Sequence, residues 1–374
     1  MSEEIKKGLV GVIADETKVS KVMPEINSLT YRGYAVQDLS EECSFEEVSY
    51  LLLNGELPNK SQLKEFEDLE RSNRDISDNL KSIIKTYPKN AHPMDTTRTS
   101  VSVMGLEDPD TGDNSKEANY RKSIRLLAKI STAVAAAFRS RKGEEIIDPD
   151  KKLSFSENFF HMCFGKIPSK EVIKAFDVSL ILYAEHSFNA STFTSRVVAS
   201  TLSDLHGAIT AGIAALKGPL HGGANEAVMH MLKEIGDPEK AETWMMDKIK
   251  NKGVLMGFGH RVYKNGDSRV PTMTKYYLKT AEFYKNEKYP KISKILQETM
   301  IREKDIHPNL DFPAGPTYYL MGFDIDFFTP IFVVSRVTGW SAHVMEQHND
   351  NRLIRPLSAY TGSEHRKVTK IENR

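Results

Sequence analysis

After Tyr34 the sequence changes to a helical pattern and keeps it almost to the end of the chain. The segment Ser44-Phe45-Glu46-Glu47 has the form of a capping box, and Asn54-Gly55 is a typical helix stop. Only residues 8–22 alternate loosely enough to predict one or two short strands. Because no strands alternate with the helices, a parallel α/β sheet is disfavoured. We predict an all-α, mostly helical chain with about fifteen or more helices.

Polar capping residues and prolines predict where further helices begin. These starts lie at Ser61, Ser77, His92-Pro93, Ala118, Ser154, Ser169 and Ala190. Residues 107–117 are polar and predict a surface loop. Residues 200–216 carry small side chains throughout, which predicts a helix buried on most sides. At 374 residues the chain exceeds one small core, so two lobes are expected.

Composition excludes several classes of protein. The 51 basic and 51 acidic side chains cancel, which argues against nucleic acid or an anionic membrane as the main partner. The two cysteines, Cys43 and Cys163, fit a reduced compartment and give no disulfide framework or cysteine metal site. Apolar runs are too short for a signal segment or a membrane span, so we expect a cytoplasmic protein.

The stretch VLMGFGHRVYKNGDSR, residues 254–269, combines glycine, histidine and positive charge. Gly257 and Gly259 flank Phe258 and lead into His260, which would let the backbone approach a ligand closely. The cations that follow are Arg261, Lys264 and Arg269. This density predicts a phosphorylated or carboxylated ligand, although each residue alone fits a glycine turn before a solvated helix.

Two more stretches carry candidate chemistry. His221 follows a helix-breaking proline and precedes Gly222-Gly223, which predicts a neutral histidine near a helix N-terminus that donates to a developing oxyanion. Asp311 stands among apolar neighbours, which would desolvate its carboxylate and make it a better base; a helix N-cap is the alternative. Taken alone, His186 is better explained as a capping-region histidine with structural hydrogen bonds, and His307 is interpreted as structural.

Arginine completes the pattern. Arg336 lies in an apolar helical segment, where an unpaired charge is costly, so something anionic is expected to meet it. Arg269 and Arg355 are further candidates. Salt bridges within the chain are one interpretation. Three such arginines with two histidines are better explained as a cage for a dicarboxylate.

Seven motifs resemble the citrate synthase family, which includes 2-methylcitrate synthase, over nearly the whole chain. They are YRGY (31–34), HPMD (92–95), HGGANE (221–226), GFGHRVYKNGDSR (257–269), PNLDFPAG (308–315), SRVTGW (335–340) and RPLSAY (355–360). The resemblance implies a compact homodimer of the bacterial and archaeal form, not a hexamer. It also implies a large domain (1–221 and 317–374) and a smaller mobile domain (222–316) that closes over substrates, with no permanent cofactor and no metal.

The resemblance also implies site roles. Asp311 would take a proton from the acyl-CoA thioester, His221 would hydrogen-bond the thioester oxygen, and His260 would bind and protonate the carbonyl oxygen of oxaloacetate. The implied oxaloacetate-binding residues are His186, His260, Arg269, Arg336 and Arg355, the last reaching the partner subunit's site. The implied coenzyme A-binding residues are Val254, Leu255, Met256, Gly257, Phe258 and Lys264. One departure is Ser268, where the family usually has proline.

The activity implied is an acyl transfer that condenses oxaloacetate with acetyl-CoA and water to give citrate and CoA. The alternative is 2-methylcitrate synthesis from propionyl-CoA, or both activities, because a hydrophobic pocket separates acyl groups differing by one methylene by only about 1–3 kcal/mol. Two other classes stay open at this stage. One is an Fe(II) enzyme with a facial triad of two histidines and an aspartate, and the other is a non-catalytic helical CoA- or nucleotide-binding regulator.

Overall fold

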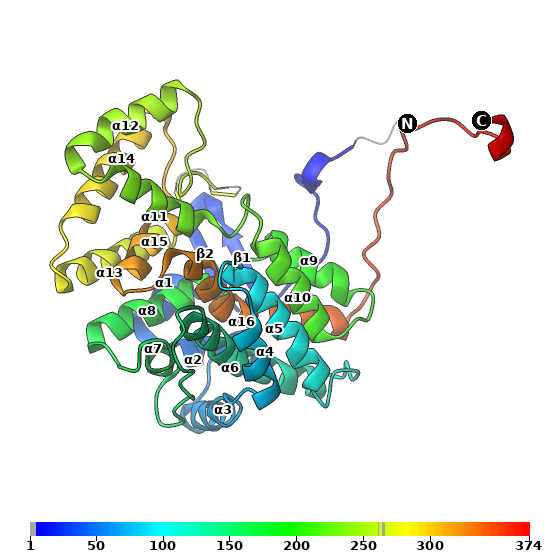
Figure 1. Cartoon of the computed structure of the whole chain (residues 1–374), viewed down its shortest axis with the longest axis horizontal. Helices are drawn as coiled ribbons and strands as arrows, with labels where there is room; N and C mark the ends of the chain where they lie inside the picture. Colours follow the sequence, from blue (N-terminus) through cyan, green and yellow to red (C-terminus); the bar gives the residue numbers. More distant parts are fainter. Residues whose placement is uncertain (1–4, 261, 264–265) are drawn as a thin grey trace.

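The computed structural model describes residues 5–260, 262–263 and 266–374. Within them the chain forms sixteen α-helices and one small antiparallel sheet, which confirms the all-α prediction (Figure 1). The first ten helices are α1 (Val36–Glu42), α2 (Phe45–Asn54), α3 (Lys60–Ser72), α4 (Asp78–Thr86), α5 (Pro93–Glu107), α6 (Lys116–Arg141), α7 (Phe155–Phe164), α8 (Lys170–Tyr183), α9 (Ala190–Ala199) and α10 (Leu205–Leu216). The remaining six are α11 (Ala224–Ile235), α12 (Pro238–Lys250), α13 (Val270–Phe283), α14 (Lys288–Lys304), α15 (Asp311–Leu320) and α16 (Phe328–Asn349).

The sheet consists of β1 (Ser20–Met23), β2 (Ser28–Tyr31) and β3 (Tyr34–Ala35), with Ser20 opposite Tyr31. The predicted strand region, residues 8–22, is therefore wrong for most of its length, and two of the three strands lie beyond it. Residues 8–16 are exposed and gain no burial that would favour a strand. Tyr31 links the sheet to the end of α8, because its hydroxyl donates to the backbone oxygens of Ile181 and Glu185 at 3.0 Å.

Most predicted helix starts are confirmed, and the capping residues explain them. Ser44 and Glu47 form the predicted capping box of α2, and Gly55 ends that helix in the left-handed conformation. Three starts are corrected. Helix α6 begins at Lys116, not Ala118, because Ser115 caps it. Helix α3 begins at Lys60, not Ser61, because Asn59 caps it. Helix α10 begins at Leu205, not near residue 200, because Asp204 accepts the backbone N–H of Gly207 and fixes the first turn there.

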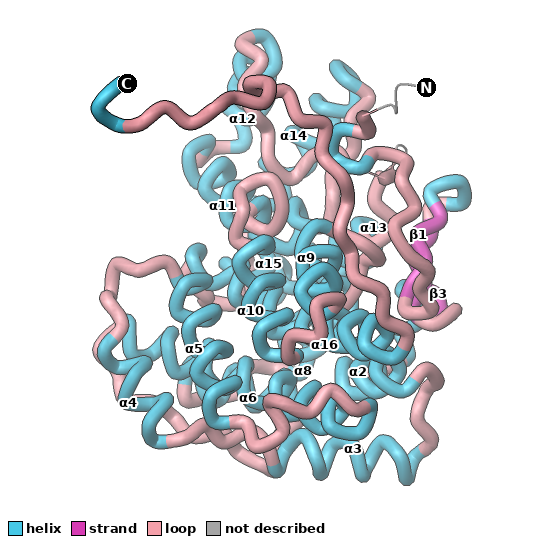
Figure 2. Tube along the Cα trace, turned by 90° about the vertical axis from the view of Figure 1, so that its right-hand side faces the viewer, coloured by secondary structure: helices cyan, strands magenta, loops and turns pink. Residues whose placement is uncertain are grey.

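Helix α16 runs through the middle of the larger group of helices (Figures 1 and 2). It packs against α2, α6, α8, α9 and α10 and is buried along nearly its whole length. Because a helix buried on all sides has no solvated face, its one guanidinium, Arg336, is held inside the protein. This places a positive charge at the centre of the fold.

Helices α11 to α14 gather at one end of the molecule, with α12 packed on α14 and both α11 and α13 packed on α15 (Figure 1). Helix α13 also contacts α8 of the larger group. Residues 350–374 leave the helical body as an extended, almost fully exposed segment (Figures 1 and 2). Among the helices described, none is both long and apolar enough to cross a membrane.

Candidate active site

Two loops are joined so that His260 lies near Asp311. The backbone N–H of Gly259 donates to the oxygen of His307 at 2.8 Å, and the N–H of Asn309 donates to the oxygen of Gly257 at 2.9 Å. The Asn309 side chain reinforces both ends: its Nδ2 donates to the oxygen of Gly259 at 3.0 Å, and its Oδ1 accepts the N–H of Asp311 at 3.2 Å. Asn309 was not predicted to have a role.

Gly257 has a different role from the one predicted. Its φ is +83°, and a Cβ there would lie 2.4 Å from a methyl carbon of Val228 on α11. Only glycine fits this conformation and this contact. The close approach is therefore to the chain itself, and it fixes the loop before His260 against α11.

Asp311 is the first residue of α15 and not its N-cap, which is Leu310. Burial raises the pKa of its carboxyl to about 6, against a hydrogen bond from Tyr183 that lowers it. The Tyr183 hydroxyl donates to Asp311 Oδ1 at 2.6 Å. The raised pKa agrees with the expectation from its apolar sequence neighbours, and the tyrosine partner was not predicted.

His221 lies in the turn between α10 and α11, where a neutral imidazole was expected. Burial lowers its pKa to about 4, and the charge of Arg336 lowers it further. Its Nε2 accepts the backbone N–H of Ser191 at 3.2 Å and lies 2.8 Å from the Ser191 hydroxyl. An accepting Nε2 places the ring proton on Nδ1, which makes Nδ1–H a donor.

His260 has the opposite arrangement. Its Nδ1 accepts the backbone N–H groups of Val262 at 3.0 Å and Tyr263 at 3.2 Å, so the proton of the neutral ring is on Nε2. Its ring centroid is 5.0 Å from that of His186, whose buried Nε2 has no hydrogen-bond partner among the described residues. Burial and then Arg269 lower the pKa of both rings, to about 4 for His260.

Arg269 is buried and paired with a carboxylate that the sequence analysis did not single out, Asp267. The Asp267 oxygens accept Nε of Arg269 at 2.9 Å and Nη2 at 2.7 Å. Asp267 Oδ2 also accepts the backbone N–H of Leu310 at 3.1 Å, which ties the arginine to the start of α15. Ser268, where the family pattern has proline, is held by a 2.9 Å contact between its hydroxyl and that of Tyr263.

Arg336 has no carboxylate within salt-bridge distance among the described residues. Its Nε donates to the backbone oxygen of Tyr183 at 2.5 Å, and its guanidinium carbon lies 4.6 Å from the Phe332 ring centroid. Burial lowers its pKa to about 10. Its charge lowers the pKa of His186, His221 and Asp311, so one guanidinium acts electrostatically on all three. A buried cation next to an unpartnered His186 Nε2 is suited to an anionic ligand.

Several other candidate residues lie away from this cluster or outside the described residues. Arg355 is exposed in the segment after α16, and within one chain it does not join the cluster. Val254 is 83% exposed, and Leu255, Met256 and Phe258 are half-buried. Arg261 and Lys264 lie outside the described residues. Over the described ranges, no three histidine, cysteine or acidic side chains lie together in a way that could hold a metal ion.

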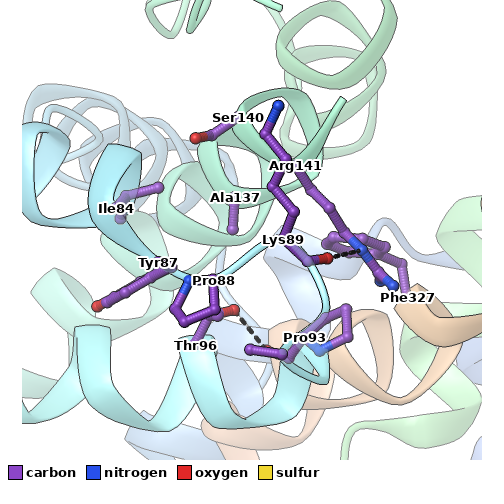
Figure 3. Close-up of a pocket in the computed structure, with 11 residues that line it drawn as sticks. Ile84, Tyr87, Pro88, Lys89, Pro93, Thr96, Ala137, Ser140, Arg141 and Phe327 are labelled. Atoms are coloured by element: carbon purple, nitrogen blue, oxygen red, sulfur yellow. Dashed lines mark hydrogen bonds between the residues drawn. The ribbon is translucent and has the colours of Figure 1, made fainter. Parts of the chain in front are cut away.

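A small cavity elsewhere in the protein does not belong to this site. It is lined by residues of α4, α5, α6 and the turns beside them, among them Tyr87, Thr96 and Arg141 (Figure 3). Its volume of about 20 Å³ is enough for roughly one water molecule. It contains none of the histidines, arginines and aspartates described above.

Comparison with known proteins gives consistent matches over the whole chain. Residues 8–357 match the family described as citrate synthase, C-terminal domain. The chain is 54% identical to 2-methylcitrate synthase 2 of Corynebacterium glutamicum, over 99% of this chain and 98% of that protein. It is 53% identical to a citrate synthase of Mycolicibacterium smegmatis, over 97% of both. A ternary complex of Thermoplasma acidophilum citrate synthase with carboxymethyl coenzyme A and oxaloacetate superposes with a TM-score of 0.92, at 34% identity over 99% of this chain and 100% of that one.

Proposed function

The chain belongs to the citrate synthase family, and from that premise we propose that it condenses oxaloacetate with acetyl-CoA and water to give citrate and CoA. The observation that carries this proposal is the hydrogen-bond geometry of Asp311, His221 and His260, which defines the free carboxylate oxygen and the proton-bearing ring nitrogens. A carboxyl with a pKa of about 6 and two imidazoles with pKa values of about 4 give one base and two neutral N–H donors at neutral pH.

In the first step Asp311 removes a proton from the methyl carbon of the acetyl thioester. The electron pair moves to the thioester oxygen, where Nδ1–H of His221 donates a hydrogen bond to the developing enolate. A carboxylate is too weak a base for an unassisted α-carbon, and one such preorganised donor contributes roughly 3–4 kcal/mol. The backbone N–H of Ser191 keeps the His221 proton on Nδ1, so the donor is in place before the substrate binds.

In the second step the enolate carbon attacks the ketone carbon of oxaloacetate. The ketone oxygen takes the proton from Nε2 of His260, whose Nδ1 is held by two backbone N–H groups, and a proton from solvent restores the neutral ring while Asp311 releases the proton it took. Arg269, Arg336 and His186 bind the two carboxylates. Hydrolysis of the thioester then releases CoA and makes the overall reaction irreversible. Water exclusion before that step requires closure over the substrates.

We propose that closure moves residues 222–316 against residues 1–221 and 317–374. The first boundary falls in the turn between α10 and α11, and the second falls inside α15 at Pro316, a residue that removes one helical hydrogen bond. The loop 254–258, with the largely exposed Val254, and Lys264 are proposed to bind coenzyme A. Small-angle scattering should show a smaller radius of gyration with oxaloacetate and a CoA thioester analogue than without them. An unchanged radius would contradict the domain assignment.

A second candidate is 2-methylcitrate synthesis from propionyl-CoA, since a relative at 54% identity bears that name. Free thiol release should be measured with oxaloacetate and each acyl-CoA, and the two kcat/KM values compared.

Asp311→Asn should lower kcat by about 10²–10⁴-fold, because it removes the general base. The exposed Asp38→Asn is the matched control and should leave kcat unchanged. Near-normal turnover by Asp311→Asn would refute the assignment, and no thiol release from either thioester would refute the proposed function.

We also propose a homodimer in which Arg355 of each chain completes the partner's site. Arg355→Ala and Asp311→Asn should each be inactive alone. Mixed chains that exchange subunits should regain about a quarter of wild-type activity, since half of the dimers are mixed and each has one intact site. An Arg355 that acted within its own chain would give no recovery.

A further inference from the structure

The carboxylate of Asp311 has two unequal oxygens. Oδ1 accepts the Tyr183 hydroxyl at 2.6 Å, whereas none of the hydrogen bonds found among the described residues ends on Oδ2. We propose that Tyr183 is the positioning residue of the general base: it holds Asp311 through Oδ1 and leaves Oδ2 for the substrate proton. This inference rests on the proposed function only in naming Asp311 as the base.

Tyr183 is itself rigidly held. It is the last residue of α8, its side chain is 1% exposed, and its ring centroid is 4.1 Å from that of Phe332 on α16. Its backbone oxygen accepts Nε of Arg336 at 2.5 Å. One residue therefore contacts the base through its side chain and the buried cation through its backbone. This connection fixes Asp311 relative to the groups proposed to bind oxaloacetate.

The hydrogen bond has a chemical consequence as well as a geometric one. A donor to a carboxylate stabilises the charged form, so it opposes the effect of burial on Asp311. Burial raises the pKa of Tyr183 well above its usual value, so the hydroxyl keeps its proton at neutral pH. Without this donor, burial would raise the pKa of Asp311 further, and less of the base would be ionised at neutral pH.

The other groups that face Asp311 do not replace this donor. Arg269 and Arg336 lower its pKa and Asp267 raises it, and none of the three changes charge near neutral pH. The neighbouring imidazoles His221 and His260 are neutral above about pH 4. We therefore expect a rate profile with an acidic limb near pH 6 that belongs to Asp311.

Tyr183→Phe tests the proposal because it removes only the hydroxyl. A hydrogen bond to a charged group contributes enough to shift a pKa by about one to two units, so the acidic limb of kcat/KM should move upward by that amount. We expect kcat to fall more than about tenfold while KM for oxaloacetate changes less. Tyr318→Phe is the matched control, since it also removes a buried hydroxyl on an aromatic ring, there bonded to Ser179. Its profile should stay that of the wild type.

Titration of the Asp311 carboxyl by NMR, with ¹³C-labelled aspartate and Asp311→Asn for assignment, separates this inference from the proposed function. An upward shift of the Asp311 pKa in Tyr183→Phe supports the proposal about Tyr183, whether or not the enzyme is active. Inactivity of the wild type with both thioesters would overturn only the proposed function. The proposal would be overturned if the wild type were active and Tyr183→Phe showed the same acidic limb and the same Asp311 titration as the wild type. If that variant does not fold, difluorotyrosine at position 183 provides the second test. Its more acidic hydroxyl should shift the pKa downward, and an unchanged pKa would again overturn the proposal.

Discussion

Replacing Asp267 by asparagine is expected to destabilise the folded chain by about 3–5 kcal/mol, because Arg269 would stay buried without its counter-ion. The Asp267 carboxylate accepts four hydrogen bonds of 2.7–3.1 Å, three from Arg269 and one from Leu310. An asparagine side chain has one acceptor oxygen, and its NH₂ group would face two of these donors. The side chains of Asp267 and Arg269 are 0% and 7% exposed, so water cannot replace the lost contacts.

Urea unfolding at equilibrium, followed by the fluorescence of the buried Trp340, measures this loss. Glu41→Gln is the matched control, because the Lys275–Glu41 pair has the same 2.7 Å separation but side chains 46% and 54% exposed. That variant should lose less than about 1 kcal/mol. The comparison therefore isolates burial as the variable.

The pH dependence of the stability difference between wild type and Asp267→Asn tests whether the buried ion pair causes that difference. Burial alone would raise the pKa of Asp267, but the Arg269 guanidinium holds it well below its usual value of about 3.9. A depressed carboxyl pKa contributes stability that is complete above the unfolded value and is lost as the pH falls through the folded one. The gap between wild type and Asp267→Asn should thus stay constant from about pH 5 to 8. A loss no larger than that of Glu41→Gln, or a gap that changes within this range, would refute the reasoning.

Three further outcomes are expected. Arg336→Met should lower oxaloacetate affinity by about 2–5 kcal/mol in calorimetric titration, yet leave urea stability unchanged or higher, because it removes a buried cation without a carboxylate partner. His92→Gln should cost up to about 1 kcal/mol more at acid pH than at alkaline pH, where only the cap contact between the Met94 N–H and His92 Nδ1 is lost. The bond to Glu226 raises the pKa of His92, so this stabilisation is complete below the unfolded pKa and lost as the pH rises through the folded one; unfolding at several pH values measures it. Gly257→Ala should destabilise the chain by roughly 1–3 kcal/mol in the same assay, through its positive φ and the contact with Val228.

The helices could be predicted from the sequence because their signals are local. The Ser44 capping box and the Gly55 stop depend on residues within one turn, and both are found as expected. The strands could not, since β2 and β3 are short and depend on pairing and on the anchoring of Tyr31 to α8. The start of α10 was missed for a similar reason: several small residues suit a helix there, and the Asp204 cap decides among them.

The residues of the candidate site also divide into those with a local sequence signal and those defined by contacts in the folded chain. His221, His260 and Asp311 stand in distinctive sequence surroundings, whereas Tyr183 is defined by a contact with a residue 128 positions away. Asp267 is only two residues from Arg269, but the bidentate pair depends on a loop conformation that residue types do not reveal. Arg355 could be predicted as a candidate, but it is exposed in one chain, and its proposed place in the partner's site depends on contacts that a single chain does not contain.

The arrangement of charge connects substrate binding to proton transfer. Burial is the main cause of the lowered pKa values of His186, His221 and His260. Arg269 and Arg336 lower that of His186 further, and each also lowers that of one other histidine, His260 and His221 respectively. Both candidate donors are therefore neutral before an anion binds, each with its proton on a defined nitrogen. A dianion bound to these guanidinium groups offsets part of their charge and so raises the pKa of the imidazoles. Oxaloacetate would thus stabilise a proton on the histidine beside it, and the cations proposed to bind the substrate would also set the proton affinity of these histidines.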